Sequence, residues 1–315
     1  MKRLFLLIPA LFVLTGAVSG PADGSRKVPL ADPFILLYDG VYYAYGTGAV
    51  NGIEVWTSRD LISWERAQGG AREGLALHRS DVWGEKWFWA PEVYRLNGRF
   101  YMYFSAEEHI CVAVSDSPLG PFVQQEKKPM IADEKCIDNT LFIDDDGRAY
   151  MYFDRFNDGL NIWVVEMEDD YMTMKKETMR PCIHVSQPWE EVWPRVNEGC
   201  FVIERNGTYY MVYSANSYES PSYGIGCATA GSPLGPWTKY GHNPLLQNPG
   251  ELVGVGHSAL FCDEEGRLKI VFHAHKSREA IHPREMYISD VRFRDGQECR
   301  LMEIDPEYTT PVIAE

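Results

Sequence analysis

The chain contains the stretch Phe100-Tyr-Met-Tyr-Phe104, which directly follows the turn Asn97-Gly98. Nearly the same arrangement returns as Ala149-Tyr-Met-Tyr-Phe153 behind Asp146-Gly147. Asn-Gly and Asp-Gly are strong signals for a tight hairpin, because these residues tolerate positive φ. Aromatic residues behind such a turn favour a strand. The two stretches therefore predict one repeated unit, a β-hairpin with an aromatic second strand.

Three further copies give the chain five such units. Their second strands read Val41-Tyr-Tyr-Ala-Tyr45, Tyr209-Tyr-Met-Val-Tyr213 and Leu268-Lys-Ile-Val-Phe272, and the five second strands start 59, 49, 60 and 59 residues apart. A strand precedes each of them, at 34–38, 93–96, 140–143, 201–204 and 258–262. A third strand follows, at 53–58, 110–115, 161–166, 223–229 and 284–289. With a less regular outer strand, as around Trp64-Glu65, each unit makes a four-stranded antiparallel blade.

Five such blades predict an all-β fold, a five-bladed β-propeller around a central channel. This arrangement leaves only short, protected sheet edges. A β-sandwich is the alternative all-β fold, but its strands would not recur in groups with a period of about sixty residues.

The first twenty residues have the three parts of a secretory signal: the basic start Met1-Lys2-Arg3, an apolar run from Leu4 to Leu14, and small residues after it. A membrane anchor needs about twenty apolar residues, and this run is shorter and is broken by Pro9. We therefore expect residues 1–20 to be removed and the product to be secreted or periplasmic. Residues 21–315 are expected to form a single propeller domain.

Charge and cysteine content narrow the ligand class. The net charge is −15, and the acidic residues are scattered rather than run together, which argues against nucleic acid or an anionic membrane as partner. A neutral ligand fits better. The seven cysteines form no CxxC pair, so zinc binding has little support. Export would permit disulfides, and the sequence leaves their formation open.

Polar residues mark the starts of the first strands, which in a propeller run along the channel and meet at one mouth. These starts carry Asp32, Asp138, Glu198 and His257. Any one acid alone is explained more simply as the cap of a turn. Converging acids, however, repel one another and raise one another's pKa, so the set indicates acid–base chemistry rather than a contribution to stability.

Four short motifs at these positions resemble one enzyme family. They are Ala31-Asp-Pro, Trp89-Ala-Pro-Glu92, Ile137-Asp-Asn-Thr-Leu-Phe142 and Asn197-Glu-Gly-Cys-Phe201. In this order they resemble glycoside hydrolase family 43 over essentially the whole mature chain. The resemblance implies that Asp32 is the general base, that Asp138 tunes and orients the acid, and that Glu198 is the general acid. Cys200 departs from the family, which often has proline after Glu-Gly.

The implied chemistry needs unequal carboxyls. Hydrolysis of a glycosidic bond requires a protonated acid beside the leaving oxygen and an ionised base that activates water. An ionised Asp138 close to Glu198 would keep Glu198 protonated by repulsion, while Asp32 stays ionised. The family inverts configuration, so the carboxyls of Asp32 and Glu198 are expected about 6.5–9.5 Å apart.

The resemblance also implies residues around the reacting centre. Trp89 matches the family's substrate-stacking tryptophan, and Trp193 is a second candidate for stacking. Arg284 matches an arginine that binds sugar hydroxyls near the general acid, although a surface arginine is the simpler alternative. His257 resembles a histidine that helps to hold a calcium or sodium ion in the channel, often through water; channel packing is its alternative role. The chemistry itself requires no cofactor.

The expected activity is the exo-acting removal of α-L-arabinofuranosyl units from an oligosaccharide or polysaccharide such as arabinan, arabinoxylan or arabinogalactan. The alternative within the class is β-xylosidase or endo-1,4-β-xylanase activity on xylan. A non-catalytic carbohydrate-binding propeller is the alternative from another class. A fructan hydrolase similar to family 32 shares the fold but retains configuration, so the product anomer distinguishes it.

Overall fold

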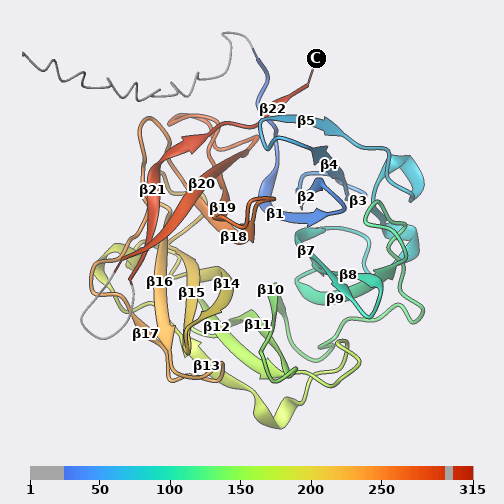
Figure 1. Cartoon of the computed structure of the whole chain (residues 1–315). Helices are drawn as coiled ribbons and strands as arrows, with labels where there is room; N and C mark the ends of the chain where they lie inside the picture. The colour runs from blue at the N-terminus through green and yellow to red at the C-terminus, as the bar shows by residue number, and fades with distance from the viewer. Residues whose placement is uncertain (1–24, 295–300, 315) are drawn as a thin grey trace, which may run out of the picture.

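The computed structural model describes residues 25–294 and 301–314, so the predicted secretory signal at residues 1–20 lies outside the described residues. Five sheets stand around a central channel, which confirms the predicted five-bladed β-propeller (Figure 1). The innermost strands, one from each blade, are β1 (Ala31–Tyr38), β7 (Trp89–Leu96), β10 (Cys136–Ile143), β14 (Asn197–Arg205) and β18 (Gly256–Cys262).

The remaining strands of each blade follow outward in chain order, each antiparallel to the one before it. Blade one adds β2 (Val41–Thr47), β4 (Val55–Ser58) and β5 (Ser63–Arg66), and blade two adds β8 (Arg99–Ala106) and β9 (His109–Ser115). Blade three adds β11 (Ala149–Phe156), β12 (Leu160–Glu166) and β13 (Arg180–Ile183). Blade four adds β15 (Thr208–Ala215), β16 (Gly224–Ala230) and β17 (Thr238–Lys239), and blade five adds β19 (Leu268–Ala274), β20 (Glu285–Arg294) and β21 (Leu301–Thr309).

Two blades depart from the predicted four strands. In blade two the described outer edge is a single bridge between Val114 and Val123 rather than a fourth strand. Blade one gains a fifth strand, β22 (Val312–Ile313), which pairs parallel to β5. The end of the chain therefore closes the blade with which the fold begins.

Short elements lie between the blades. The predicted strand at 53–58 is divided, because β3 (Gly52–Ile53) leaves blade one and pairs with β6 (Leu77–His78). The helical elements are single 3-10 turns, η1 (Arg72–Gly74), η2 (Arg79–Asp81), η3 (Lys176–Thr178) and η4 (Pro188–Glu190). Over the described part of the chain, no helix reaches the length and hydropathy that a membrane crossing needs.

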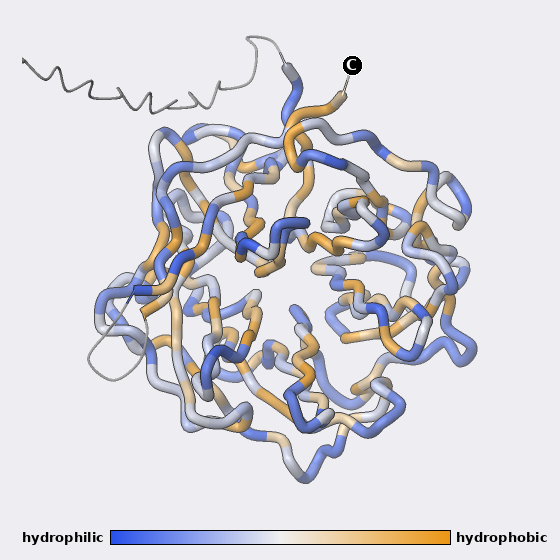
Figure 2. The backbone as a smooth tube through the Cα atoms, viewed as in Figure 1, coloured by the Kyte–Doolittle hydropathy of each residue, from blue (hydrophilic) through white to orange (hydrophobic). Residues whose placement is uncertain are grey.

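Buried aromatic strands hold neighbouring blades together, and apolar segments run through the interior of the disc (Figure 2). Two equivalent contacts show the repeat. Tyr45 of blade one donates to the carbonyl of Pro118 at 2.6 Å, and Tyr152 of blade three donates to that of Pro233 at 2.8 Å. The two acceptors hold the same place in the sequence Ser-Pro-Leu-Gly-Pro, which occurs at 117–121 in blade two and again at 232–236 in blade four. These two second strands are therefore each fastened to the following blade.

The cysteines behave as core residues. Six of the seven lie in the described residues, and no disulfide joins them there. Cys111, Cys136, Cys200 and Cys227 are buried in the blades. These four therefore act as small apolar side chains.

Candidate active site

Each innermost strand is interrupted at the same place by a β-bulge. The regular register breaks between Ala31 and Phe34, Trp89 and Glu92, Ile137 and Thr140, Glu198 and Phe201, and Gly256 and Ala259. The first bulge residues have positive φ, with values of 48° at Asp32, 45° at Ala90, 54° at Asp138, 54° at Gly199 and 45° at His257. Such values are uncommon for residues other than glycine and cluster at functional sites.

The bulges join each blade to the one before it. The N–H of each first bulge residue donates to a side chain at the end of the preceding blade's second strand. The five bonds run from Asp32 to His273 Nδ1 (3.1 Å), Ala90 to Thr47 Oγ1 (3.0 Å), Asp138 to Ser105 Oγ (3.2 Å), Gly199 to Asp154 Oδ2 (3.2 Å) and His257 to Ser214 Oγ (2.7 Å). These bonds form a closed ring around the channel, since blade one is held by blade five.

The bulges also place the predicted site residues. Asp32, Asp138 and His257 hold equivalent positions and line one small cavity in the channel. Glu198 does not hold the equivalent position, because it precedes its bulge by one residue and pairs with Ser214 in β15. The prediction that all three acids occupy matching positions is thus off by one residue for Glu198.

Asp32 is held as an anion by the groups beside it, above all by the cation Arg284. The Nη1 of Arg284 donates to its Oδ1 at 2.8 Å, and the Nη2 donates to its Oδ2 at 3.3 Å. The Nδ1 atoms of His273 and His257 lie 3.3 and 3.5 Å from Oδ1. Burial raises the pKa of Asp32, but the charges of Arg284 and His257 and the hydrogen bond to His273 outweigh it and hold the pKa well below its usual value.

The pKa of Glu198 is shifted in the opposite direction, upward. It is buried and accepts a hydrogen bond from the hydroxyl of Tyr223 at 2.8 Å. Burial, with a smaller contribution from the charge of Asp32, raises its pKa to about 7, against the Tyr223 hydrogen bond and the charge of Arg284. Glu198 therefore keeps its proton below about pH 7, in mildly acidic solution where Asp32 is ionised.

Asp138 is less simple than the sequence suggested. Burial and the charges of Glu198 and Asp32 raise its pKa well above the usual value, whereas the interaction with the Asp154 side chain lowers it. The expectation that Asp138 stays ionised thus depends on Asp154, a completely buried residue of β11. The charges of Asp138 and Glu198 in turn raise the pKa of Asp154, so the three carboxyls disfavour one another's ionisation.

Four functional positions were missed from the sequence: Asp154, His273, Ser214 and Tyr223. A signal for three of them was present. In four repeats the residue directly after the aromatic second strand is polar, namely Ser105, Asp154, Ser214 and His273. These are the residues that accept the bulge N–H groups, so aligning the repeats one position further would have found them. Tyr223 opens the predicted third strand at 223–229 and lies directly before β16, and it carried no such signal.

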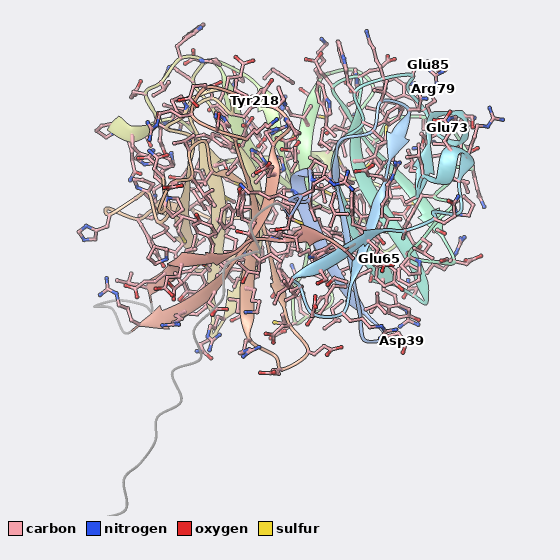
Figure 3. All side chains as sticks on the ribbon, turned by 90° about the horizontal axis from the view of Figure 1, so that it is seen from above. Asp39, Glu65, Glu73, Arg79, Glu85 and Tyr218 are labelled. Atoms are coloured by element: carbon pink, nitrogen blue, oxygen red, sulfur yellow. The ribbon has the colours of Figure 1, made fainter. Side chains whose placement is uncertain are left out.

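Arg284 is better placed than a surface arginine. Its guanidinium lies 4.8 Å from the centre of the Tyr218 ring, and its Nε is buried with no hydrogen-bond partner among the described residues. Its charge also lowers the pKa of Glu198. The arginine therefore lies between both carboxyls rather than beside the acid alone. Figure 3 shows Tyr218 and the hairpin turn at Asp39 on opposite faces of the propeller. The innermost strands begin at the face that carries Tyr218 and end at the face that carries Asp39.

Replacing Arg284 tests its hold on Asp32. Arg284→Gln removes the cation, so the pKa of Asp32 is expected to rise. A base must be ionised to act, and a higher pKa moves the acid limb of the kcat/KM profile to higher pH by the same amount. Arg267→Gln, at an arginine that pairs with Asp263 instead, is the matched control. An acid limb that stays in place in Arg284→Gln would contradict this role.

The predicted stacking residues differ in their surroundings. Trp89 is half-buried and stacks on Trp87, with ring centres 5.6 Å apart and planes 15° apart. Trp87 is 43% exposed and has the Lys86 Nζ 4.0 Å from its ring centre. Trp193 is 84% exposed in the segment before β14. One face of Trp89 is thus covered by Trp87, and the exposed aromatic surface lies on Trp87 and Trp193.

Among the side chains that the structure describes, the channel holds no direct set of metal ligands. In the described residues, no group of three His, Cys, Asp or Glu side chains converges as a metal site. His257 lies near Asp32 and 3.8 Å from Asp138, and calcium prefers oxygen ligands. The cavity has room for about one water molecule. The buried side chains of Asn139 and Ser258 line it without hydrogen-bond partners, so they fit a water molecule better than a directly bound ion.

Glu92 is a further buried acid of the channel cavity. It accepts a hydrogen bond of 2.5 Å from the hydroxyl of Tyr94, and burial raises its pKa to about 8. It is therefore neutral at the pH at which Asp32 is ionised. The other carboxyl that lines the cavity beside Asp32 and Asp138 thus adds no charge to them.

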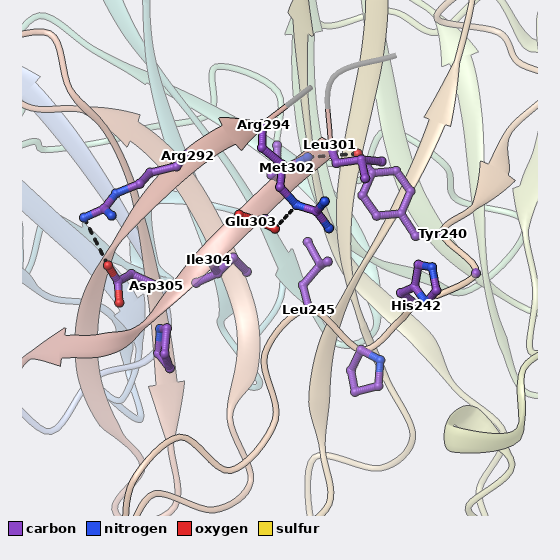
Figure 4. A pocket seen from close by; sticks show the side chains of 13 residues that line it. Tyr240, His242, Leu245, Arg292, Arg294, Leu301, Met302, Glu303, Ile304 and Asp305 are labelled. Carbon is purple, nitrogen blue, oxygen red and sulfur yellow. Dashed lines mark hydrogen bonds and ion pairs between the residues drawn. The ribbon is translucent and has the colours of Figure 1, made fainter. Parts of the chain in front are cut away.

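A separate hollow of about 600 Å³ lies between the outer parts of blades four and five (Figure 4). Its charged side chains pair with each other, Arg292 with Asp305 at 3.1 Å and Arg294 with Glu303. None of the predicted site residues lines it. The candidate active site is therefore the channel mouth.

Comparison with known proteins identifies the family of the chain. The model of Glycosyl hydrolases family 43 matches residues 27–297. An endo-1,4-β-xylanase structure from Bacteroides thetaiotaomicron is 45% identical with a TM-score of 0.87, covering 93% of this chain and 99% of that one. A thermostable family-43 glycoside hydrolase structure is 35% identical with a TM-score of 0.81, covering 93% and 98%.

Curated relatives are more distant. The β-D-galactofuranosidase xynD of Aspergillus niger is 26% identical over 293 residues, which are 84% of this chain and 80% of that protein. The arabinoxylan arabinofuranohydrolase of Bacillus subtilis is 27% identical over 297 residues, 80% of this chain. The chain spans only 57% of the length of that second relative.

Proposed function

Because the chain belongs to glycoside hydrolase family 43, we propose that it hydrolyses glycosidic bonds with Asp32 as general base, Glu198 as general acid and Asp138 as the residue that tunes the acid. One observation carries this assignment: in a single site, the pKa of Asp32 is lowered and that of Glu198 is raised to about 7. Two carboxyls whose surroundings separate their pKa values are the pair that acid–base hydrolysis requires.

The two carboxyls act on different atoms. Glu198 gives its proton to the glycosidic oxygen, and the departing sugar leaves as a neutral alcohol. Asp32 takes a proton from the water that attacks the anomeric carbon from the opposite side. Arg284 keeps Asp32 ionised before this transfer. The mechanism inverts configuration, so NMR of the first product anomer tests it: a retained anomer would instead indicate a nucleophile, as in a fructan hydrolase similar to family 32.

For the substrate we propose terminal α-L-arabinofuranosyl units of arabinan, arabinoxylan or arabinogalactan, removed in exo mode. Both curated relatives described above are named for furanosides. The second candidate is xylan, as β-xylosidase or endo-1,4-β-xylanase activity, because the 45% identical structure is that of an endo-1,4-β-xylanase. The exposed rings of Trp87 and Trp193 could bind sugars of either polymer.

Digestion of the four polysaccharides with product sizing separates these candidates. Free arabinose from arabinan or arabinoxylan, with the xylan backbone uncut, supports the first. A ladder of xylo-oligosaccharides, or xylose alone, supports the second. Binding without release of 4-nitrophenol from its α-L-arabinofuranoside or β-D-xyloside, and without cleavage of any polymer, would support a non-catalytic carbohydrate-binding propeller.

The alkaline limb of the pH profile tests the role of Asp138. The wild-type kcat/KM is expected to fall above about pH 7, as Glu198 loses its proton. Asp138→Asn removes a negative charge beside Glu198, which lowers the pKa of Glu198 and moves this limb to lower pH. Activity also falls, because less of the acid is protonated. A limb that does not move would show that Asp138 has no influence on the acid.

We further propose that residues 1–20 direct export and that the mature enzyme meets its polysaccharide outside the cytoplasm. Mass determination of the N-terminus of protein from a secreting host tests this. A product that still carries residues 1–20 would contradict it.

A further inference from the structure

Asp154 lies between the two carboxyls assigned to the acid side of the reaction. It is completely buried in β11, and its strand partner is Ile137, the residue before Asp138. Its Oδ2 accepts the N–H of Gly199 at 3.2 Å, and Gly199 directly follows Glu198. One residue therefore contacts the segments that carry both Asp138 and Glu198, the first through its backbone and the second through its side chain.

Fastening the bulge does not require a carboxyl. At the four equivalent positions a neutral side chain accepts the same N–H through one atom: Thr47, Ser105, Ser214 and His273. Asp154 alone has a second oxygen, Oδ1, which is buried and accepts no hydrogen bond. No salt bridge of residues 25–294 and 301–314 includes Asp154. An ionised carboxyl buried in this way is unfavourable.

The second oxygen has a partner if it carries a proton. The side chains of Asp154 and Asp138 interact, and this interaction raises the pKa of Asp154 and lowers that of Asp138. Two carboxyls can form a hydrogen bond with each other only when one is protonated, because an ionised carboxylate is an acceptor alone. The proton balance of the two residues is therefore decided by what surrounds each of them.

The surroundings place the proton on Asp154. The titratable groups that face it are Cys136 and Asp138 on β10, Cys182 on β13, and Glu198 and Cys200 on β14. All are acids or thiols. Asp138, in contrast, has the His257 ring nitrogen at 3.8 Å and the charge of Arg284 near it. Burial and the charges of Asp138 and Glu198 raise the pKa of Asp154 well above its usual value.

We propose that Asp154 is a positioning residue that holds a proton and donates it in a hydrogen bond to Asp138, while its other oxygen holds the Gly199 N–H. This inference rests on the proposed roles of Asp138 and Glu198. The bond stabilises the charge on Asp138, and that charge keeps Glu198 protonated. The grip on Gly199 fixes the acid at a constant place relative to the residue that tunes it.

Two substitutions separate this role from simple fastening of the bulge. Asp154→Ser supplies the hydroxyl found in blades two and four, which accepts from Gly199 but is too short to donate to Asp138. Asp138 then takes up the proton and no longer repels a charge on Glu198. We expect kcat/KM to fall by about tenfold, part of the ~10²–10⁴-fold that acid–base catalysis contributes, and the alkaline limb to move to lower pH.

Asp154→Asn is the rescuing variant. Its amide accepts with Oδ1 and donates with Nδ2, so it makes both bonds of a protonated Asp154. It is expected to recover most of the activity lost in Asp154→Ser and to return the alkaline limb to its wild-type place. A limb in Asp154→Asn that shifts as far as in Asp154→Ser overturns the proposal, because it would mean that a charge on Asp154 had been removed.

Infrared spectroscopy detects the proton without any substrate. The measurement uses the Glu198→Gln protein, in which the general acid contributes no carboxyl band, with and without Asp154→Asn. The difference at neutral pH is expected to show the loss of one C=O stretch of a protonated carboxyl. An unchanged spectrum in that region overturns the proposal. Because no turnover is needed, this result is independent of whether the proposed glycosidase activity is found.

Discussion

Glu198→Gln is expected to lower turnover on a polysaccharide or an alkyl oligosaccharide by about 10²–10⁴-fold, the usual contribution of a positioned general acid. The glutamine keeps the shape of the side chain and can still accept the hydroxyl of Tyr223, but it has no proton to give to the leaving oxygen. Folding is expected to be preserved, since the buried group remains hydrogen-bonded. Steady-state rates and a thermal unfolding midpoint check both statements.

The leaving group supplies the control. A 4-nitrophenyl glycoside departs as a stabilised phenolate and needs little protonation, so Glu198→Gln is expected to lose much less activity on it. An equal loss on both substrates would indicate that Glu198 does something other than protonate the leaving oxygen. Wild-type turnover of the unactivated substrate by Glu198→Gln would remove it from the site altogether.

Asp32→Asn is expected to abolish activity to a similar extent on both substrates. The base acts on the attacking water, so a better leaving group does not compensate for its loss. Asparagine is the appropriate replacement, because the residue has a φ of 48° and asparagine tolerates this left-handed conformation. The bulge and its N–H bond to His273 are therefore expected to remain.

Asp32→Asn also leaves Arg284 without its ionised partner, so stability needs its own measurement. Asp263→Asn is the matched control, since it likewise removes the ionised partner of an arginine, Arg267. Asp263 directly follows β18, at the end of that strand away from His257 and the site. A variant that unfolds at the wild-type temperature and is inactive supports the base assignment. Retained turnover in a folded Asp32→Asn protein would contradict it.

The propeller was predictable because its signal is local and repeated five times. A turn such as Asn97-Gly98 and the aromatic strand behind it are recognisable within one repeat. The departures arise from contacts between distant segments. Nothing in the sequence near Val312 indicates that it pairs with Ser63 in blade one. The predicted fourth strand of blade two is reduced to the bridge between Val114 and Val123, and this depends on how the segments pair.

The candidate site was predictable for the same reason, and only as far as the repeat shows it. Asp32 and Asp138 stand at a repeated position, and the sequence showed that position. The one-residue offset of Glu198 depends on the bulge register, which alternation of residue types does not reveal. The proton shared with Asp154 depends on burial and on the distance between two side chains, and neither can be read from the chain.

Each hydrogen bond in the ring of bulges uses the side chain of one residue and the backbone N–H of another. The residue that accepts the N–H needs only a suitable atom, and threonine, serine, aspartate and histidine all serve. The residue that donates uses its backbone, so its side chain is free to be an acid, an alanine, a glycine or a histidine. The blades can therefore differ in the residue that faces the channel, which is an acid in blades one and three, while every blade still closes the ring.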